Sequence, residues 1–499
     1  MIVSHAFAGK KVAVFGLART GLSAIASLTA GGAGVIAWDD NATARDLGGQ
    51  AGAQILPWRE WAWTGIAALV LSPGVPLTHP KPHEVVSHAQ RAGVPIIGDV
   101  ELFAREIRPD AAEKGRAPVI AITGTNGKST ITALIGHILT ANGFDAQVGG
   151  NIGKAVLDLN PPLFSGRDGA RTIYVIEMST FQIDLAPGFA PDIGILSNLS
   201  PDHIDRHGSM EKYAAIKARL MKAVPPGNET LPGQTVIGVD DAQCSAIFTS
   251  LAGTNATPVS VGKVLGRGIF VVDGVLYDAR NGAATKVMAL DGAPNLPGAH
   301  NWQNAALAYA ATKPFVKEAR AIADAIAGFP GLAHRMESVG AIGKTRFVND
   351  SKATNADAAA KALAVYPDIF WIAGGKAKDG GIESLSPFFD RIRRAYLIGD
   401  AAPAFARTLD GKAPYVMAGT LERAVELAAA DAAAGTAPAP VVLLSPACAS
   451  YDQFKDFEQR GDVFRAAVTK LGANLMLRQA QHEDKTEDLT LSAFKGEAP

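Results

Sequence analysis

The stretch Thr123-Gly124-Thr125-Asn126-Gly127-Lys128-Ser129-Thr130 follows the apolar run Val119–Ile122 and precedes a segment whose apolar residues recur at helical spacing. A strand, a tight glycine turn and a helix N-terminus together aim backbone N–H groups at a phosphate. In such a loop Lys128 is expected to reach the outer phosphates, and the Ser129 hydroxyl to hold Mg²⁺. We therefore predict that this stretch binds a nucleotide, although a glycine-rich turn without a ligand is the simpler alternative.

This loop departs from the general phosphate-loop pattern G-x-x-x-x-G-K-[ST] in one place. The pattern requires glycine at position 122, which is Ile122 here, and the first glycine is Gly124, only three residues before Gly127. The strand before the loop and the helix after it still favour phosphate binding.

The overall composition is that of an ordinary globular chain. Of 499 residues, 48% are hydrophobic and 19% are charged, which predicts about three domains with ample cores. With 47 Lys+Arg against 48 Asp+Glu, no general attraction to nucleic acid or to an anionic membrane is expected. Two cysteines and the absence of a cationic leader or a membrane-spanning run indicate a soluble cytoplasmic protein, not inserted in a membrane.

A second glycine turn, Gly16-Leu17-Ala18-Arg19-Thr20-Gly21, follows an apolar run near the N-terminus. Asp39 and Asp40 lie about 20 residues further on, as in dinucleotide-binding folds. The middle glycine of that fingerprint is Ala18, however, so NAD binding is the minority interpretation. Another nucleotide diphosphate, or a turn without a ligand, remains open.

Three further segments carry candidate chemistry near the phosphate loop. Glu177 ends the apolar run 173–176, where an NTPase commonly holds or orients Mg²⁺. His203 and His207 have the i, i+4 spacing of a zinc pair, but their segment reads as a loop, which favours Mg²⁺ or substrate contact. Lys217 lies on a predicted helix over Met210–Met221 and, from the pattern alone, is a solvated lysine.

The remaining chain alternates between short apolar runs and helical segments. Runs 269–272 and 275–277 flank Asp273-Gly274 and predict a hairpin. Regular β/α alternation after residue 332 predicts a doubly wound domain. The predicted fold is α/β in three parts: a Rossmann-like domain (1–107), a central P-loop domain with a mostly parallel sheet (108–331) and a C-terminal Rossmann-like domain (332–477). A disordered tail (478–499) is expected to follow.

These motifs, in this order, resemble the Mur ligase family. The short phosphate loop beginning at Gly124 is a variant shared by Mur ligases and folylpolyglutamate synthetases, which accounts for Ile122. The stretches Asn349-Asp350-Ser351-Lys352-Ala353-Thr354-Asn355 and 445–454, SPACASYDQF, are similar to the family member that adds D-glutamate. The resemblance covers nearly the whole chain, except for residues 223–290 and the tail.

The resemblance implies an ATP-dependent amide ligase of peptidoglycan precursor synthesis, linked to cell shape and division. The L-alanine carboxylate of UDP-N-acetylmuramoyl-L-alanine would attack the ATP γ-phosphate and give an acyl phosphate, which the D-glutamate amine then displaces. The implied cofactors are ATP and two Mg²⁺ ions, and the implied partners are small-molecule substrates of a monomeric enzyme. Lys217 matches the lysine that is carbamylated in the family.

The family pattern also assigns the candidate site residues. Lys128, Glu177, His203 and Lys217 would be catalytic, and Ser129, Glu177, His203 and carbamylated Lys217 would bind metal. ATP would contact Gly124, Thr125, Asn126, Gly127, Lys128, Ser129, Thr130, Asn301, Asn304, Arg335 and Asp350. The UDP-sugar would contact Thr20, Asp39, Ser72, Asn151 and Gln182. D-Glutamate would contact Thr354, Lys378, Ser450 and Phe457.

Three alternatives remain at this point. Another amino-acid ligase of the same architecture is the nearest, although folylpolyglutamate synthetases normally lack the N-terminal domain. A nucleotide-switch protein is disfavoured because the chain has no Asn-Lys-x-Asp guanine motif. An NAD-dependent dehydrogenase is disfavoured by Ala18.

Overall fold

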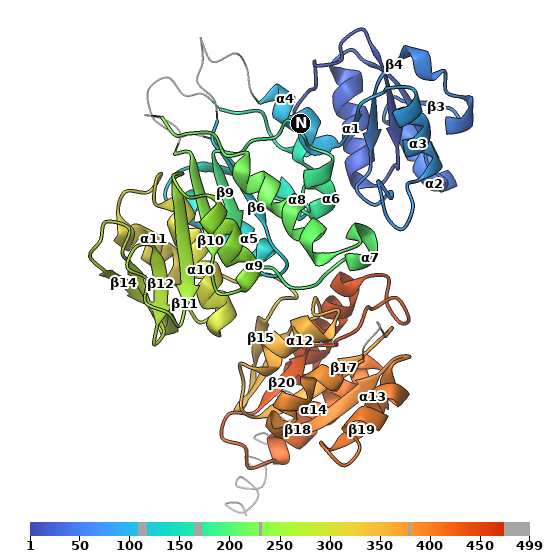
Figure 1. The fold of residues 1–499 in the computed structure, drawn as a ribbon. Coiled ribbons are helices and arrows are strands. Elements are labelled where there is room, and N and C mark those ends of the chain that lie inside the picture. The colour runs from blue at the N-terminus through green and yellow to red at the C-terminus, as the bar shows by residue number, and fades with distance from the viewer. Residues whose placement is uncertain (108–116, 164–171, 229–231, 378–380, 474–499) are drawn as a thin grey trace, which may run out of the picture. The chain divides into compact units, whose positions relative to one another are not determined.

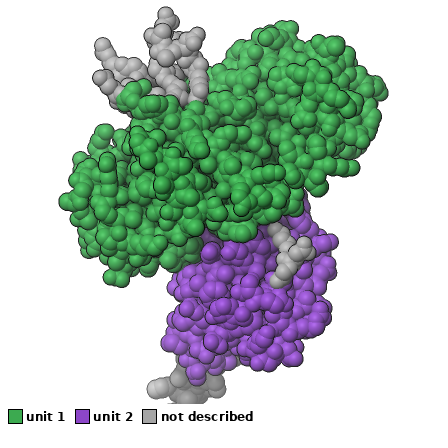
Figure 2. Space-filling model, in the orientation of Figure 1, with its two compact units in different colours: residues 1–329 green, residues 330–499 purple. Residues whose placement is uncertain are grey.

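A computed structural model describes residues 1–107, 117–163, 172–228, 232–377 and 381–473. It divides into two compact units, residues 1–329 and residues 330–499, which Figure 2 shows in different colours. The start of the predicted central domain at residue 108 and the predicted tail 478–499 lie outside the described residues. Among the described helices, none combines the length and apolar character needed to cross a membrane.

The first unit begins with a parallel sheet of order β3-β2-β1-β4-β5 (Figure 1). Its strands are β1 (Lys11–Phe15), β2 (Gly34–Trp38), β3 (Gln54–Ile55), β4 (Ile66–Leu71) and β5 (Ile96–Ile97). Its helices are α1 (Arg19–Ala30), α2 (Ala42–Gln50), α3 (Glu84–Arg91) and α4 (Asp99–Glu106). The strand order 3-2-1-4-5 is that of a Rossmann-like half, which places ligand-binding turns at the carboxyl ends of β1 and β4.

The second sheet of this unit has nine strands in the order β14-β13-β12-β11-β10-β9-β6-β8-β7. All neighbours from β12 to β7 are parallel, whereas β12, β13 and β14 pair antiparallel. The strands are β6 (Val119–Thr123), β7 (Asp145–Gly150), β8 (Thr172–Glu177), β9 (Ile193–Leu196), β10 (Gln234–Gly238), β11 (Ala256–Val261), β12 (Ile269–Val272), β13 (Val275–Asp278) and β14 (Thr285–Ala289). The helices are α5 (Lys128–Ala141), α6 (Thr180–Asp184), α7 (Ile204–His207), α8 (Met210–Lys222), α9 (Ala242–Ser250), α10 (Ala299–Thr312) and α11 (Ala319–Ala327).

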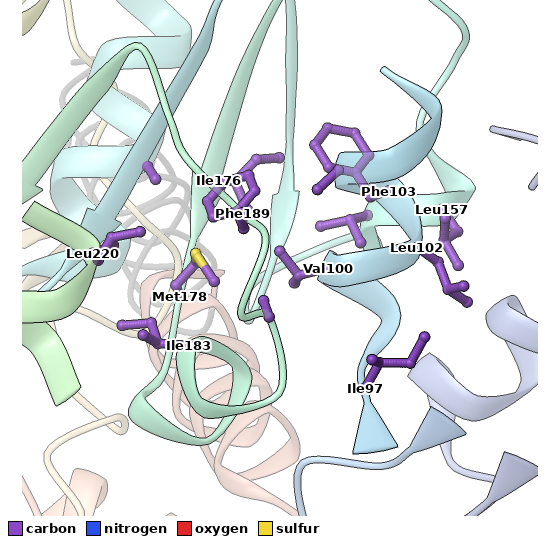
Figure 3. Packing of buried hydrophobic residues seen from close by; sticks show 14 of the residues in the cluster. Ile97, Val100, Leu102, Phe103, Leu157, Ile176, Met178, Ile183, Phe189 and Leu220 are labelled. Carbon is purple, nitrogen blue, oxygen red and sulfur yellow. The ribbon is translucent and has the colours of Figure 1, made fainter. Parts of the chain in front are cut away.

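The two sheets of the first unit share one hydrophobic core. Figure 3 shows Val100 and Phe103 of α4 beside Ile176 and Phe189 of the central sheet region, and all four are buried. Phe103 meets Tyr174 edge to face, with ring centroids 5.1 Å apart. Burial of such aromatic and aliphatic surface is the main stabilising term of a domain junction. This shared core explains why residues 1–329 form one compact unit.

The second unit is built on a six-stranded sheet of order β15-β16-β20-β17-β18-β19, parallel except for the β15–β16 pair. Its strands are β15 (Glu337–Ile342), β16 (Thr345–Asn349), β17 (Ile369–Gly374), β18 (Ile392–Ile398), β19 (Tyr415–Gly419) and β20 (Val441–Leu444). Its helices are α12 (Ala356–Leu363), α13 (Ala402–Leu409) and α14 (Leu421–Ala434). Buried residues gather in two separate clusters of this unit, as expected for a sheet covered on both sides.

The predicted α/β fold with parallel-rich sheets is therefore confirmed. The hairpin is also confirmed: β12 and β13 pair antiparallel, and both Asp273 (φ 50°) and Gly274 (φ 71°) adopt positive φ, as a two-residue turn requires. Ser209 caps α8 by accepting a hydrogen bond from the Lys212 backbone N–H, as its position before the helix indicates.

Candidate active site

The phosphate loop connects the end of β6 to the start of α5. Gly124 (φ 145°) and Gly127 (φ 84°) adopt backbone conformations that favour glycine, and a Cβ at either position would collide with a neighbouring side chain. At Gly124 that neighbour is the Ser197 Oγ, and at Gly127 it is the Asn304 Oδ1. The two glycines are thus required by close packing as well as by the turn.

Lys128 lies at the first position of α5 and folds back over the loop. Its Nζ donates hydrogen bonds to the Gly124 carbonyl at 2.9 Å and to the Thr125 carbonyl at 2.7 Å. This places a cation over the turn whose backbone N–H groups begin the helix. A cation at that position suits the outer phosphates of a nucleotide.

The segment after β9 holds the loop in place. Asn198 accepts from the Thr125 N–H through its carbonyl (2.8 Å) and from the Asn126 N–H through its Oδ1 (2.9 Å). Ser197 Oγ donates to the Asn126 carbonyl at 2.6 Å, and the Thr125 hydroxyl lies 3.0 Å from the Tyr213 hydroxyl. The sequence analysis assigned no role to Ser197, Asn198 or Tyr213. Tyr213 could have been found from its position four residues before Lys217 on the same helix face.

Glu177 occupies the end of β8 with only 2% of its surface exposed. Its Oε1 accepts a hydrogen bond from Asn151 Nδ2 at 2.8 Å, while its buried Oε2 has no hydrogen-bond partner among the described residues. A buried carboxylate oxygen without a partner is energetically costly unless a cation or proton meets it. The Glu177 Oε2 therefore suits Mg²⁺ as a ligand, because Mg²⁺ prefers oxygen ligands and usually binds one or two carboxylates together with water and phosphate.

The interpretation of Lys217 as a solvated lysine was wrong. The side chain is 2% exposed, and its Nζ donates to the Thr123 Oγ1 at 3.1 Å and to the Gly124 carbonyl at 2.9 Å. Burial, followed by the nearby Lys128 charge, lowers the pKa of Lys217 well below its usual range. Two donated bonds satisfy both N–H groups of a neutral amine and leave its lone pair for chemistry.

The two histidines of this region differ in burial, and the predicted loop contains the one-turn helix α7. His207 is 4% exposed, its Nε2 lies 2.8 Å from the Thr180 Oγ1, and its ring stacks on Phe181 at 5.3 Å. Burial lowers the pKa of His207 to about 4, so the ring is neutral at pH 7. His203 is half exposed at the N-terminus of α7 with positive φ, close to Asp202. Within the described residues no group of three or more His, Cys, Asp or Glu side chains could hold a metal ion.

The amides Asn301 and Asn304 lie on the first turns of α10. Asn304 Nδ2 donates to the Asn301 Oδ1 at 3.0 Å, and Asn301 Nδ2 donates to the Pro297 carbonyl at 2.9 Å. Both side chains are buried, and Asn304 lies against Gly127. The structure therefore brings this predicted pair to the phosphate loop.

The candidates for UDP-sugar binding gather at the carboxyl edge of the N-terminal sheet. Asp39 Oδ2 accepts from the Leu17 N–H at 2.6 Å, and Gly16 packs directly against Ser72. Thr20 follows Arg19 on the first turn of α1, and the Arg19 guanidinium reaches the turn that carries Asn151 by donating to the carbonyls of Gly150 and Gly153. Gln182 is different, because its Oε1 accepts from the Ser179 N–H and thereby completes the N-terminal cap of α6.

In the second unit, Asp350 lies at the carboxyl end of β16. Its Oδ2 accepts from the Ser445 Oγ at 2.9 Å, and its Oδ1 accepts from the Met336 N–H at 3.2 Å. Burial raises the pKa of Asp350 to about 7, and the Arg335 charge is among the groups that lower it. Asp350 and Arg335 are thus electrostatically coupled, and their contact with ATP stays a prediction.

The candidates for D-glutamate binding also lie in the second unit. Ser450 is 2% exposed. Phe457 begins a helical segment, and the Lys352 Nζ lies 3.8 Å from its ring centroid. Thr354 is half-buried in the turn before α12. The buried Arg460 donates to the carbonyls of Ser351 and Cys448 and so ties the two motif loops together. Sequence reasoning missed Arg460, although an arginine three residues after Phe457 was visible. Lys378 lies outside the described residues.

The geometry of the first unit defines a class of protein, since its phosphate loop, buried carboxylate and desolvated lysine suit phosphoryl transfer from a nucleotide. Residues 122–312 match the family model described as the Mur ligase middle domain, and residues 334–448 match the one described as Mur ligase, glutamate ligase domain. The chain belongs to the Mur ligase family.

Curated relatives agree with this assignment over most of the chain. Proteins named UDP-N-acetylmuramoylalanine--D-glutamate ligase are 52% identical in Caulobacter vibrioides (95% of this chain, 98% of the relative) and 51% identical in Rhizobium meliloti (96% and 100%). Among solved structures, the UDP-N-acetylmuramate-alanine ligase of Thermotoga maritima is 15% identical with a TM-score of 0.53, over 92% of this chain and 99% of that one. That likeness supports the fold.

Proposed function

We propose that this protein is an ATP-dependent ligase that joins D-glutamate to UDP-N-acetylmuramoyl-L-alanine through an acyl phosphate, in peptidoglycan precursor synthesis. The observation that carries the proposal is the 52% identity over 95% of the chain to relatives of that name. The geometry around Lys128, Glu177 and Lys217 is compatible with the first half-reaction. We place the reaction in the cytoplasm, in a monomer that acts on small-molecule substrates.

The proposed division of labour follows the three sheets. Residues 1–107 would bind the UDP-sugar, with Thr20, Asp39 and Ser72 on the sheet edge and Asn151 and Gln182 beside it. Residues 108–331 would bind ATP through the loop 124–130, Asn301 and Asn304. Residues 332–477 would bind D-glutamate through Thr354, Lys378, Ser450 and Phe457, and would add Arg335 and Asp350 to the ATP site.

The first step is transfer of the γ-phosphoryl group from ATP to the L-alanine carboxylate, with ADP as the leaving group. Two anions must approach each other, so the residues must supply positive charge where negative charge accumulates. Lys128, already held over the loop, would contact the outer phosphates. Mg²⁺, when bound through Ser129, Glu177, His203 and carbamylated Lys217, would neutralise phosphate charge.

The second step is attack of the D-glutamate amine on the acyl phosphate carbon, followed by loss of inorganic phosphate and formation of the amide. The D-glutamate amine must first lose a proton.

A carbamate on Lys217 would form when the lone pair of its neutral amine attacks CO₂ and one N–H proton is lost. The product is an anion that can bind a metal and that replaces the neutral amine.

The test is phosphate release from ATP in the presence of UDP-N-acetylmuramoyl-L-alanine and one amino acid at a time. D-Glutamate should support turnover, whereas L-glutamate, L-lysine and meso-diaminopimelate should not. Turnover with another acceptor, or with none, would contradict the proposal. Lys128→Ala should abolish turnover, and the exposed Lys212→Ala on α8 provides the matched control.

A further inference from the structure

A hollow beside the central sheet is lined by none of the residues assigned to ATP. Its volume is about 1260 Å³, and it is lined by Gln234 at the start of β10, Asn255 before β11 and Gly268 before β12. The phosphate loop and Glu177 lie at the opposite ends of their strands, since β6 and β8 run parallel to β10 and β11. Gln234, Asn255 and Gly268 therefore lie at the other edge of the sheet, whereas Val239 and Lys263 follow the carboxyl ends of β10 and β11.

Four cationic side chains line this hollow: Lys263, Arg267, Arg280 and Lys313. We call it the basic pocket. Asp278 is the one carboxylate among the lining residues, and it is already engaged by Arg280 at 2.6 Å and by the Tyr309 hydroxyl at 3.1 Å. The chain as a whole has a formal net charge of −1, so the positive lining is a local feature. Such a concentration of one sign of charge in a hollow attracts anions.

Lys263 and Arg267 belong to the glycine-rich loop 262–268, between β11 and β12. In the described part of the chain neither residue makes a hydrogen bond or ion pair within the protein. A Cβ at Gly262 or Gly266 would meet no atom within 4 Å, so the loop backbone is open to a ligand. The Gly262 N–H donates to the Val271 carbonyl at 2.8 Å, so the two cationic side chains are the groups of this loop that would meet an anion.

We propose that the basic pocket binds a phosphate-bearing anion of nucleotide size, separately from the ATP site. The volume of about 1260 Å³ lies above the range of about 300–1,000 Å³ that is typical of small-molecule pockets. A single phosphate would therefore fill little of the hollow, and a larger anion fits it better. Lys263 and Arg267 contact the phosphates, and Arg280, held by Asp278, is a further cation of the lining. This goes beyond the proposed ligase activity and does not require it.

Helix α10 links the basic pocket to the phosphate loop. Asn304 on its first turns lies against Gly127, Tyr309 binds Asp278, and Lys313 directly follows the helix. Fourteen helical residues span about 21 Å, so one rigid element touches both sites. Helix α10 therefore connects a ligand bound in the basic pocket with the nucleotide site.

The experiment uses the full chain carrying Lys128→Ala, which removes the cation of the phosphate loop. Inorganic pyrophosphate and GDP are titrated separately by calorimetry, and the measurements are repeated after adding Lys263→Ala and Arg267→Ala. The matched control adds Lys286→Ala and Arg320→Ala, two exposed cations of the same unit outside the pocket. Saturable binding should weaken about tenfold or more in the pocket variant and stay unchanged in the control.

The two probes separate the sources of phosphate. Equal affinity for pyrophosphate and GDP assigns the pocket to phosphate alone, and tighter GDP binding assigns it to a nucleotide. Absence of saturable binding of both probes, or equal weakening in the pocket and control variants, overturns the proposal. Ligation is measured separately in the chain with Lys128 intact, where Lys263→Ala/Arg267→Ala should leave basal activity unchanged. A failure of the ligase assignment is thus seen independently.

Discussion

The chemistry of Lys217 depends on its surroundings more than on its residue type. On helix α8 the neighbouring Lys222 is exposed, whereas Lys217 is buried under Thr123 and Gly124. Burial penalises the ammonium form and favours a neutral amine, which is the form that captures CO₂. A lysine at this position therefore has the protonation state that carbamate formation requires.

Lys217→Ala should lower ATP-dependent phosphate release by on the order of 10²-fold, because the anion expected on this side chain is lost. Added acetate or formate should restore part of the activity by supplying a carboxylate to the vacated space. Lys222→Ala, on the exposed face of the same helix, should retain activity. Lack of any restoration by short-chain acids would leave the carbamate without support.

Asp99 gives a pH-dependent test of burial. It is 2% exposed at the start of α4, and neither carboxylate oxygen has a hydrogen-bond partner within the described residues. Burial raises its pKa from 3.8 to about 6, and the N–H groups of Val100 and of Asp99 itself are the next largest influence, in the opposite direction. The native state therefore binds the proton more tightly than the unfolded state, and stability falls as the pH rises through this range.

Asp99→Asn remains neutral at every pH, so its stability relative to the wild type should increase between pH 4 and pH 7. The difference should grow by roughly 2 to 3 kcal/mol, which is the free energy of a two-unit pKa shift. Urea unfolding of both proteins across this pH range measures it, with the exposed Asp46→Asn as control. A difference that does not change with pH would show that Asp99 ionises normally in the folded protein.

At the scale of elements, sequence patterns predicted what local chemistry specifies. The Asp273-Gly274 hairpin and the Ser209 cap follow from turn and capping preferences of a few neighbouring residues, and both are confirmed. The burial of Lys217 could not be predicted in this way, because Thr123 and Gly124 come from a strand and loop about 93 residues earlier. Arg460 was missed for the same reason: one of its acceptors, Ser351, lies 109 residues earlier in the chain.

The first turn of α1 and the turn after β7 form a joint between the two sheets of the first unit. Arg19 donates to the carbonyls of Gly150 and Gly153. Asn151, which follows Gly150, donates to Glu177 twice: its Nδ2 to the Glu177 Oε1, and its backbone N–H to the Glu177 carbonyl at 2.9 Å. A side chain of helix α1 therefore braces the turn that orients the candidate metal ligand. Positioning of this kind commonly tunes metal affinity.

Arg19→Leu should raise the Mg²⁺ concentration needed for half-maximal phosphate release several-fold, because the turn carrying Asn151 loses its brace. The KM for ATP should change less. Arg59→Leu, at an exposed ion pair with Glu84 in the same sheet region, is the matched control. If Arg19→Leu raised only the KM for the UDP-sugar, the residue would act on that substrate and not through Glu177.

At the scale of the whole molecule, apolar burial is divided between the two units. The core around Phe103 contains only residues before 252, and the core around Phe405 contains only residues after 347. Each unit thus has the hydrophobic core needed to fold cooperatively by itself. Chains of this kind depart from two-state unfolding.

Thermal unfolding should therefore show at least two transitions, which Phe103→Ala and Phe405→Ala should lower one at a time. Both side chains are buried, and removal of a buried phenylalanine typically costs about 3–5 kcal/mol. Calorimetry of the two variants and the wild type assigns each transition to its unit. Because the substitutions are identical in chemistry, a difference between them reports location. A single transition lowered equally by both would mean that the two cores unfold as one cooperative body, and that residues 1–329 and 330–499 stabilise each other more strongly than their separate cores imply.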